Sequence, residues 1–317
     1  MEFVVNRNKR EGARQLSAAR KEIKVVDVAV ETAVANSYID DARAMPMYLI
    51  RNAAFGVVGD GPREYVEGLE ISTLENFFKI SYSGLRLDMY DLDVYQAITE
   101  LWIHNGQGNK IAISAYKLLT LIKRDTSAKS YESLKKSLQR LMSASLLISG
   151  TSVEYYGHML ESIIIEKSSN NLVFRFNEEL KKIYPKERLL HQDISIRCQL
   201  DGDVAKWIYN FYSSHNPKNI QNHSIAQLCE LCGTKSDVYN FKKRLDATLT
   251  KLATLGIVDK HEFAKVNGEW RVMVWLKKTD ISKRNVDALV AESKTYKAYT
   301  QSTSKKVSLL PGGKPLT

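Results

Sequence analysis

Two segments with the same order of predicted elements constrain the fold of this chain most strongly. In the first, the hydrophobic pattern predicts a helix over 91–104, a short strand at 110–113, helices starting at 115 and 131, and strands over 146–156, 158–167 and 172–176. The second predicts a strand over 194–200, helices over 201–215 and 225–232, a long helix from 235 or 236 to 255, and two strands joined by Asn267-Gly268. No strict sequence repeat accompanies this repeated order.

Helix, short strand, helix, helix and a two-stranded ribbon is the order of a winged helix. In that helix-turn-helix fold, the third helix can enter a DNA major groove with the ribbon beside it. The predicted class is therefore α+β, with two tandem winged-helix domains. The predicted organisation is an N-terminal arm over 1–44, domain 1 over 45–180, a linker over 181–193, domain 2 over 194–280, and a C-terminal helix with a mobile tail over 281–317.

Local signals predict where these elements begin and end. Capping residues are expected at Ser114, Ser130, Ser224, Gly233 and Gly256. The stretch FFKISYSGLRL (77–87) alternates on both sides of Ser83-Gly84, which predicts a hairpin. Residues 177–192 predict a connecting helix that runs into the linker.

The net charge of +10 is unevenly distributed along the chain. Residues 27–100 carry five Lys and Arg against thirteen Asp and Glu, whereas 101–150 carry eight against two and 205–278 carry twelve against six. Double-stranded DNA is the expected partner, because Lys and Arg that neutralise phosphates release condensed counterions. A basic surface that only confers solubility is the alternative.

The pattern of apolar stretches and the number of cysteines predict a cytoplasmic protein. No stretch approaches the roughly 18 apolar residues that a membrane span needs, and the N-terminus lacks the apolar core of a signal peptide. Three cysteines, an odd number, argue against a disulfide framework. We expect a cytoplasmic protein with no membrane partner.

The long helix of the second segment carries the strongest nucleic-acid signal. If Val238, Phe241, Leu245, Leu249 and Leu252 face the core, its other side presents groups that can bond bases and phosphates. The candidate DNA-binding residues there are Lys235, Ser236, Tyr239, Asn240, Lys242, Lys243 and Arg244. Those of the first segment are Lys129, Ser130, Ser133, Lys136 and Arg140, where backbone contact is expected more than base reading. The alternative is a solvated helix face in a domain that binds only protein.

Cys229 and Cys232 form a C-x-x-C, the spacing of zinc knuckles and redox dithiols. The other candidate zinc ligands, Cys198, His215 and His223, are scattered over a strand, a helix end and a loop. Because the two cysteines lie within one predicted helix next to leucines, we expect them to be small core residues, with no metal bound.

Catalysis finds little support in the sequence. The six histidines include no H-x-H pair and none begins an H-x-x-R, and there is no G-x-x-x-x-G-K-[ST] for nucleotide hydrolysis. We therefore expect neither enzyme activity nor a cofactor.

Several stretches resemble the TrfA group of plasmid replication initiators, within the wider class of iteron-binding Rep proteins. They are RAMPMYLIRNAAFGV (43–57), KISYSGLRLDMYDLDVYQAITE (79–100), and FYSSH (211–215) followed by LCG (231–233). The resemblance covers roughly 43–278 and rests on the co-occurrence of these stretches in matching order. It implies two winged-helix domains that bind direct repeats (iterons) at a plasmid origin, with 236–255 as the main base-reading helix.

The resemblance also implies partners and regulation. Such initiators open adjacent AT-rich DNA and recruit the host initiator DnaA and the replicative helicase, while their homodimers restrain initiation or repress the gene and so control plasmid copy number. TrfA-type proteins can carry a clamp-binding Q-L-x-L-F near the N-terminus. Here QLSAAR (15–20) lacks the paired apolar residues that fill a clamp pocket.

The predicted function is a plasmid replication initiator that binds iterons. A winged-helix transcriptional regulator is the alternative, and its operator would more often be an inverted repeat near a promoter. A third reading is a protein-interaction module of winged helices with no role at DNA.

Overall fold

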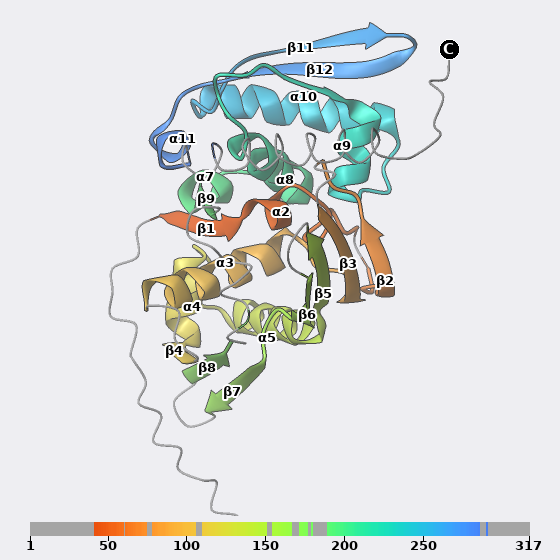
Figure 1. The fold of residues 1–317 in the computed structure, drawn as a ribbon. Coiled ribbons are helices and arrows are strands. Elements are labelled where there is room, and N and C mark those ends of the chain that lie inside the picture. The colour runs from red at the N-terminus through yellow and green to blue at the C-terminus, as the bar shows by residue number, and fades with distance from the viewer. Residues whose placement is uncertain are drawn as a thin grey trace, which may run out of the picture. The chain divides into compact units, whose positions relative to one another are not determined.

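The computed structural model describes residues 41–59, 61–74, 78–105, 110–150, 154–166, 171–176, 179, 189–285 and 290 (Figure 1). Several predictions fall outside these residues. They concern the arm up to 40 with its QLSAAR stretch, the connecting helix and linker over 177–188 apart from 179, and the C-terminal helix and tail over 286–317 apart from 290. No helix in the described ranges has both the length and the apolar character that a membrane span requires.

The N-terminal half, 42–175, contains two antiparallel sheets and three longer helices. Its elements are β1 (Ala42–Pro46), α2 (Met47–Ile50), β2 (Tyr65–Ile71), β3 (Phe78–Leu85), α3 (Met89–His104), β4 (Lys110–Ser114), α4 (Ala115–Leu121), α5 (Ala128–Ser143), β5 (Ser145–Gly150), β6 (Glu154–His158), β7 (Ser162–Glu166) and β8 (Asn171–Arg175). One sheet has the strand order β2-β3-β5-β6 and the other β4-β8-β7. The strand predicted over 146–156 is therefore wrong, because β5 and β6 pair with each other as separate strands.

The C-terminal half, 189–284, has one sheet of three strands in the order β10-β12-β11. Its elements are β9 (Leu189–Asp193), α7 (Ile194–Cys198), α8 (Gly202–Ser213), β10 (Gln221–Ser224), α9 (Ile225–Cys232), α10 (Val238–Thr254), β11 (Val258–Val266), β12 (Glu269–Leu276) and α11 (Asp280–Arg284). The ribbon β11–β12 runs beside α10, which also packs on α8 and α9 (Figure 1). The predicted α+β class is confirmed.

Several local predictions hold because the signals act within one turn of chain. Ser114 and Ser224 accept hydrogen bonds from the backbone N–H groups of Lys117 and Gln227, at 3.2 and 3.1 Å, and so cap α4 and α9. Gly233 ends α9 in the left-handed conformation, with φ of 68°. The Asn267-Gly268 turn has positive φ at both residues, as its tight hairpin requires.

The prediction of a strand over 194–200 is wrong. Residues Ile194–Cys198 form helix α7, because the Asp193 carboxylate accepts hydrogen bonds from the backbone N–H groups of Ser195 and Ile196. The residues just before it, expected in a connecting helix and linker, instead form β9, which pairs antiparallel with β1. His223, expected in a loop, likewise lies in a strand, β10, which pairs with β12.

The predicted hairpin around Ser83-Gly84 is also wrong, because β3 runs through both residues as one strand. Gly84 has φ of +136°, and a Cβ built there would lie 2.8 Å from the Ser143 carbonyl oxygen. The glycine lets β3 pass close to the end of α5 instead of turning the chain back.

Gly84→Ala is expected to lower the free energy of unfolding by about 1–3 kcal/mol, since the new side chain combines an unfavourable φ with a backbone clash. Urea unfolding of the variant would measure this loss. Gly268→Ala is a matched control, because it has a positive φ of 84° but no atom within 4 Å of the added Cβ. An equal loss in both variants would show that the close approach contributes nothing.

The two halves share one hydrophobic core. The cluster of buried residues runs without a break from β1 through α3 and α5 into α8, α9, α10 and β12. Trp207 on α8 is 1% exposed, and its indole N–H donates to the Asn52 carbonyl at 3.1 Å.

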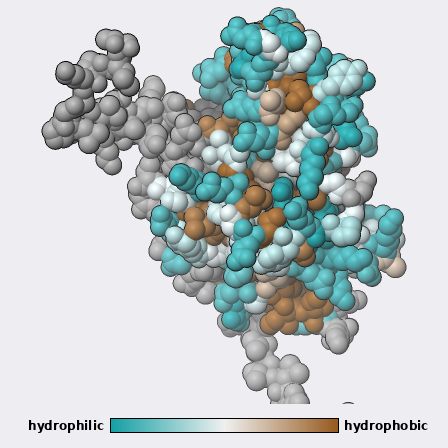
Figure 2. All heavy atoms as spheres, turned by 90° about the vertical axis from the view of Figure 1, so that its right-hand side faces the viewer, coloured by the Kyte–Doolittle hydropathy of each residue, from teal (hydrophilic) through white to brown (hydrophobic). Residues whose placement is uncertain are grey.

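On the face shown in Figure 2, hydrophilic residues predominate and hydrophobic residues form separate patches. The predicted domain boundaries stay a prediction.

Buried ion pairs join the same two halves. Asp93 on α3 is 3% exposed and contacts Arg197 on α7 at 2.6 Å and Lys206 on α8 at 2.9 Å. The Arg197 guanidinium also donates to the Asn210 side chain and to the Met89 carbonyl. Buried charges are tolerated only when paired and hydrogen-bonded, so these contacts fix the halves in one arrangement.

Asp203, on α8 near the same pairs, should make stability depend on pH. Burial, together with repulsion from Asp88, raises its pKa from 3.8 to about 6. The folded chain therefore holds a proton that the unfolded chain has already lost between these values. The stability that the bound proton of Asp203 contributes is fully present below the unfolded pKa of 3.8. It is lost as pH rises through the folded pKa of about 6.

Asp203→Asn is accordingly expected to raise the unfolding free energy by about 1–3 kcal/mol at about pH 8. The gain should shrink towards about pH 4, where the wild-type carboxyl is already protonated. Urea unfolding at both pH values measures the difference, and the same gain at both would contradict the assignment.

Candidate nucleic-acid interface

Helix α10 begins at Val238, two or three residues later than the sequence predicts. Its cap is Asp237, whose carboxylate accepts the backbone N–H of Asn240 at 2.9 Å and the Asn240 side-chain amide at 2.6 Å. These hydrogen bonds lower the pKa of Asp237, so the carboxylate is ionised at the N-terminal end of the helix. Lys235 and Ser236 therefore lie in the turn before α10, with the Ser236 backbone N–H donating to the Thr234 hydroxyl at 3.2 Å.

The buried side of α10 is largely the predicted one. Phe241, Leu245, Leu249 and Leu252 are all 0% exposed. Val238 is 39% exposed, so its predicted place in the core is wrong. It is the first residue of the helix, and no core element covers it.

The opposite side of α10 presents most of the candidate residues to solvent. Tyr239, Asn240, Lys243 and Arg244 are exposed, and the Lys243 ammonium lies 4.4 Å from the centre of the Tyr239 ring. Tyr239 and Lys243 lie one turn apart on the helix, and this contact leaves both side chains accessible. Asn240 donates to Asp237, so one of its amide donors is already engaged.

Lys242 faces the ribbon instead of this exposed strip. Its ammonium lies 4.4 Å from the ring centre of Phe263 on β11 and 4.7 Å from that of Trp270 on β12. Lys242 thus links the helix to the ribbon, and Trp270 is itself 40% exposed beside it. No local sequence pattern predicts this pairing, because the rings belong to strands more than 20 residues away.

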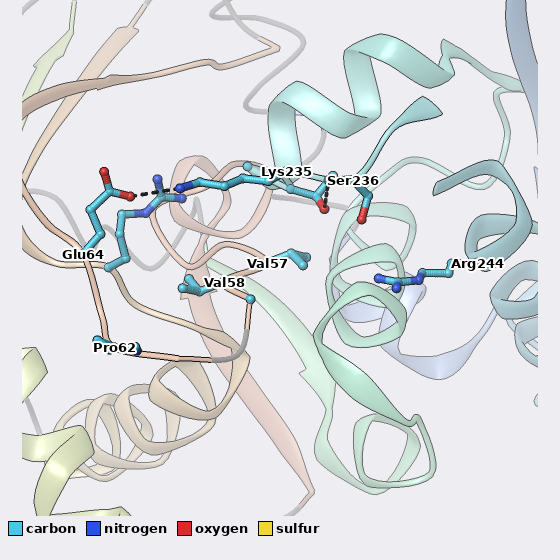
Figure 3. Close-up of a pocket in the computed structure, with 11 residues that line it drawn as sticks. Val57, Val58, Pro62, Glu64, Lys235, Ser236 and Arg244 are labelled. Atoms are coloured by element: carbon cyan, nitrogen blue, oxygen red, sulfur yellow. Dashed lines mark hydrogen bonds and ion pairs between the residues drawn. The ribbon is translucent and has the colours of Figure 1, made fainter. Parts of the chain in front are cut away.

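A basic hollow of about 410 Å³ lies where the turn before α10 meets the N-terminal half (Figure 3). We call it the junction hollow. Arg86, Lys235 and Arg244 line it, against the single carboxylate of Glu64, which contacts the Lys235 ammonium at 3.4 Å. Arg244 reaches towards it from α10 (Figure 3). Positive charge from both halves therefore meets at one concave surface.

Arg86 is the member of the junction hollow that sequence reasoning missed. It lies between β3 and α3, about 150 residues before Lys235 along the chain. One guanidinium nitrogen lies so close to Gly56 and Gly233 that a Cβ at Gly233 would be 2.8 Å from it. The glycine that ends α9 thus leaves room for Arg86, a relation that no local pattern carries.

The five candidates on α5 are brought together at a second hollow, of about 470 Å³. We call it the α5 hollow. The predicted cap at Ser130 is wrong, because Ser127 caps the helix and accepts the Ser130 backbone N–H at 3.3 Å. Lys129 and Lys136 are exposed, and Lys136 pairs with Glu132 at 3.5 Å. Ser130 and Ser133 are half-buried beside them.

Arg140 also lines the α5 hollow, but its charge is taken up inside the protein. Its guanidinium donates to both carboxylate oxygens of Asp91 on α3, at 2.7–3.1 Å, and Asp91 is 0% exposed. Such a bidentate pair is strong and geometrically fixed. Arg140 therefore holds α5 against α3, and its net charge at the surface is small.

The C-x-x-C lies within α9, as predicted, and faces the core. Cys229 and Cys232 are 9% and 0% exposed, and burial raises the pKa of their thiols to about 11 and about 12. Both are therefore protonated near neutral pH, which is unfavourable for metal ligation or redox attack. Within the described ranges, no three His, Cys, Asp or Glu side chains gather in a way that could hold a metal ion.

Comparisons with known proteins agree with a role in replication. The family model for replication initiator protein A matches residues 84–255, more than half of the chain. A crystal structure of selenomethionine derivatives of domains 2 and 3 of RctB is similar, with a TM-score of 0.50 at 12% identity, covering 74% of this chain and 99% of that one. This likeness shows the fold alone. A second crystal structure of RctB domains 2–3 gives a TM-score of 0.44 at 12% identity, with 72% and 96% covered. No curated protein sequence matches the chain.

Proposed function

Because this chain belongs to the replication initiator protein A family, we propose that it initiates plasmid replication by binding direct-repeat DNA at an origin. The observation that carries the proposal is the exposed strip on α10. There Tyr239, Lys243 and Arg244 are exposed, and Arg244 also lines the junction hollow. A convex helix edged by basic groups suits a DNA major groove.

We assign two winged-helix units on the basis of a shared strand order. In the C-terminal half, the short strand before α9 pairs with the second strand of the ribbon, which gives β10-β12-β11. In the N-terminal half, the strand before α4 does the same, which gives β4-β8-β7. Under this assignment α5 and α10 are equivalent third helices, and β5–β6 is an insertion that joins the β2–β3 pair.

The two third helices differ in the contacts they can make. Helix α10 offers Lys243, which can bond guanine acceptors, and aromatic and amide groups close by. The α5 candidates are mainly Lys and Ser, which suit phosphates and carry little sequence information. We therefore assign base reading mainly to α10 and backbone contact mainly to α5.

The remaining parts of the proposal rest on the resemblance to TrfA-type initiators. The bound protein opens AT-rich DNA next to the repeats and recruits the host initiator DnaA and the replicative helicase. Homodimers restrain initiation and so control copy number. The protein acts by binding, without catalysing a covalent step.

Footprinting on the origin of the plasmid that encodes the chain tests this function. Protection of tandem repeats of about two helical turns each, beside an AT-rich segment, is the expected result for two linked groove-binding helices. Protection of an inverted repeat at a promoter would instead support a transcriptional regulator. Binding that disappears at moderate salt without any sequence preference would overturn both DNA-reading functions.

A further inference from the structure

The α5 hollow has more positive charge than its walls neutralise. Five basic side chains line it, of which Arg140 pairs with Asp91 and Lys136 with Glu132, and the lining itself holds the two carboxylates of Asp88 and Asp125. Asp88 caps α3 and pairs with Arg63, and Asp125 accepts hydrogen bonds from the Ser127 backbone N–H and the Ser130 hydroxyl. These hydrogen bonds lower the pKa of Asp125 to about 2. Asp88 is thus engaged by Arg63, and Asp125 by Ser127 and Ser130, whereas Arg124 and Lys129 have no ion-pair partner among the described residues.

Two polar groups in the wall of this hollow have no hydrogen-bond partner among the described residues. They are the Nη1 atom of Arg63 and the hydroxyl of Tyr90, and neither atom is exposed to solvent. Burial raises the pKa of Tyr90 to about 12, so its hydroxyl is protonated and can donate. Buried donors without acceptors are uncommon and costly, and an anion would supply the acceptors they lack.

Arg124 is the side chain placed to open this wall. It is exposed and lies 5.3 Å from the centre of the Tyr90 ring, and it makes no ion pair with any described residue. Arg63, Tyr90 and Arg124 all line the same hollow, so a single ligand held in it would face all three side chains. Three donors on one oxygen-rich anion match the hydrogen-bonding capacity of a phosphate group.

We propose that the α5 hollow holds one backbone phosphate of bound DNA, with Arg63, Tyr90 and Arg124 as its donors. This inference rests on the proposed function and assigns three residues outside the α5 candidates to that interface. A free nucleotide is a poorer fit, because base pockets are usually lined by apolar and aromatic walls. Tyr90 is the one aromatic ring in the lining, and Arg124 already lies over it.

The test compares the full chain with three variants on a duplex of its origin repeat. Arg124→Gln removes one phosphate-neutralising charge, so the slope of log affinity against log salt should fall in magnitude by about 0.9. Tyr90→Phe removes only a neutral donor, so affinity should fall about tenfold with the slope unchanged. Lys135→Gln is the matched control, since Lys135 is exposed on α5 but does not line the hollow.

A neutral methylphosphonate scanned along the duplex locates the contact. It should weaken the wild type at one backbone position and cause no further loss there in Arg124→Gln. If the wild type binds the repeats while Arg124→Gln and Tyr90→Phe match Lys135→Gln, the phosphate site is refuted and the proposed function stands. If the wild type shows no preference for any origin repeat, the proposed function fails first.

Inorganic phosphate and AMP, titrated into the full chain without DNA, distinguish the source of the phosphate. Weak binding at most is expected, because the duplex positions the group through its other contacts. Tight binding of either probe that Arg124→Gln abolishes, with duplex affinity unchanged, would assign the hollow to a free phosphate compound and overturn the proposal.

Discussion

An Arg197→Ala variant is expected to lose about 3–5 kcal/mol of unfolding free energy, the largest effect we expect from a single substitution. The Arg197 side chain is 0% exposed and contacts the Asp93 carboxylate at 2.6 Å. Its removal leaves that carboxylate with Lys206 alone and strips the Asn210 side chain and the Met89 carbonyl of a donor. The loss comes chiefly from a buried charge that keeps too few partners.

Urea denaturation followed by circular dichroism measures this loss. Lys283→Ala is the control, because Lys283 also contacts a carboxylate, Asp280, at 2.7 Å, but in an exposed pair. Exposed pairs contribute little, so no measurable change is expected there. A similar result for both variants would mean that the Asp93 network does not hold the halves together.

Lys243→Ala is expected to cost about 1–3 kcal/mol of binding free energy on the cognate repeat, with reduced discrimination against altered repeats. Lys243 is exposed in the middle of the α10 strip, next to Tyr239, with no ion pair among the described residues. Base contacts carry sequence preference, so affinity for unrelated DNA should change much less. Competitive binding with cognate and scrambled duplexes measures both quantities.

Two further lysines make this result specific. Lys251→Ala, on the last turn of the same helix, removes the same charge from a residue that pairs with Asp201, and it should leave discrimination unchanged. Lys136→Ala on α5 should weaken all duplexes alike and flatten the salt dependence. The roles assigned to α5 and α10 would be wrong if Lys243→Ala and Lys136→Ala both bound like the wild type.

The sequence predicts well those structural features that depend on residues only a few positions apart. The buried side of α10 follows from the spacing of Phe241, Leu245, Leu249 and Leu252, which repeats with the helical period. Ser114 and Ser224 are read correctly as caps for the same reason, because the N–H groups they accept lie three residues ahead.

The misread elements depend on partners that are distant in sequence. Residues 189–193 form a strand because β1, about 150 residues earlier, pairs with them, and Gly84 serves a close approach to α5 instead of a turn. A short apolar alternation such as 194–200 fits a strand or a buried helix equally, and the Asp193 cap decides between them.

The candidate interface shows the same division. The exposure of Lys243 and Lys129 follows from helical spacing. The sequence alone does not reveal that Asp91 engages Arg140, or that Phe263 and Trp270 engage Lys242. Arg86 joins Lys235 and Arg244 only through the fold. A list of basic residues on a helix therefore overstates some contributions and omits others.

The shared core has a consequence for the DNA that the protein can accept. Since α5 and α10 belong to halves joined by one continuous core and by the Asp93 ion pairs, they cannot adjust independently to a target. One base pair added between the two contacted stretches turns one of them by about 35° around the duplex axis, because a turn takes about 10–10.5 base pairs. If α5 and α10 both contact DNA as proposed, helical phase decides as much as sequence which repeats are bound, and a drift of half a turn would leave one helix facing the wrong side of the duplex.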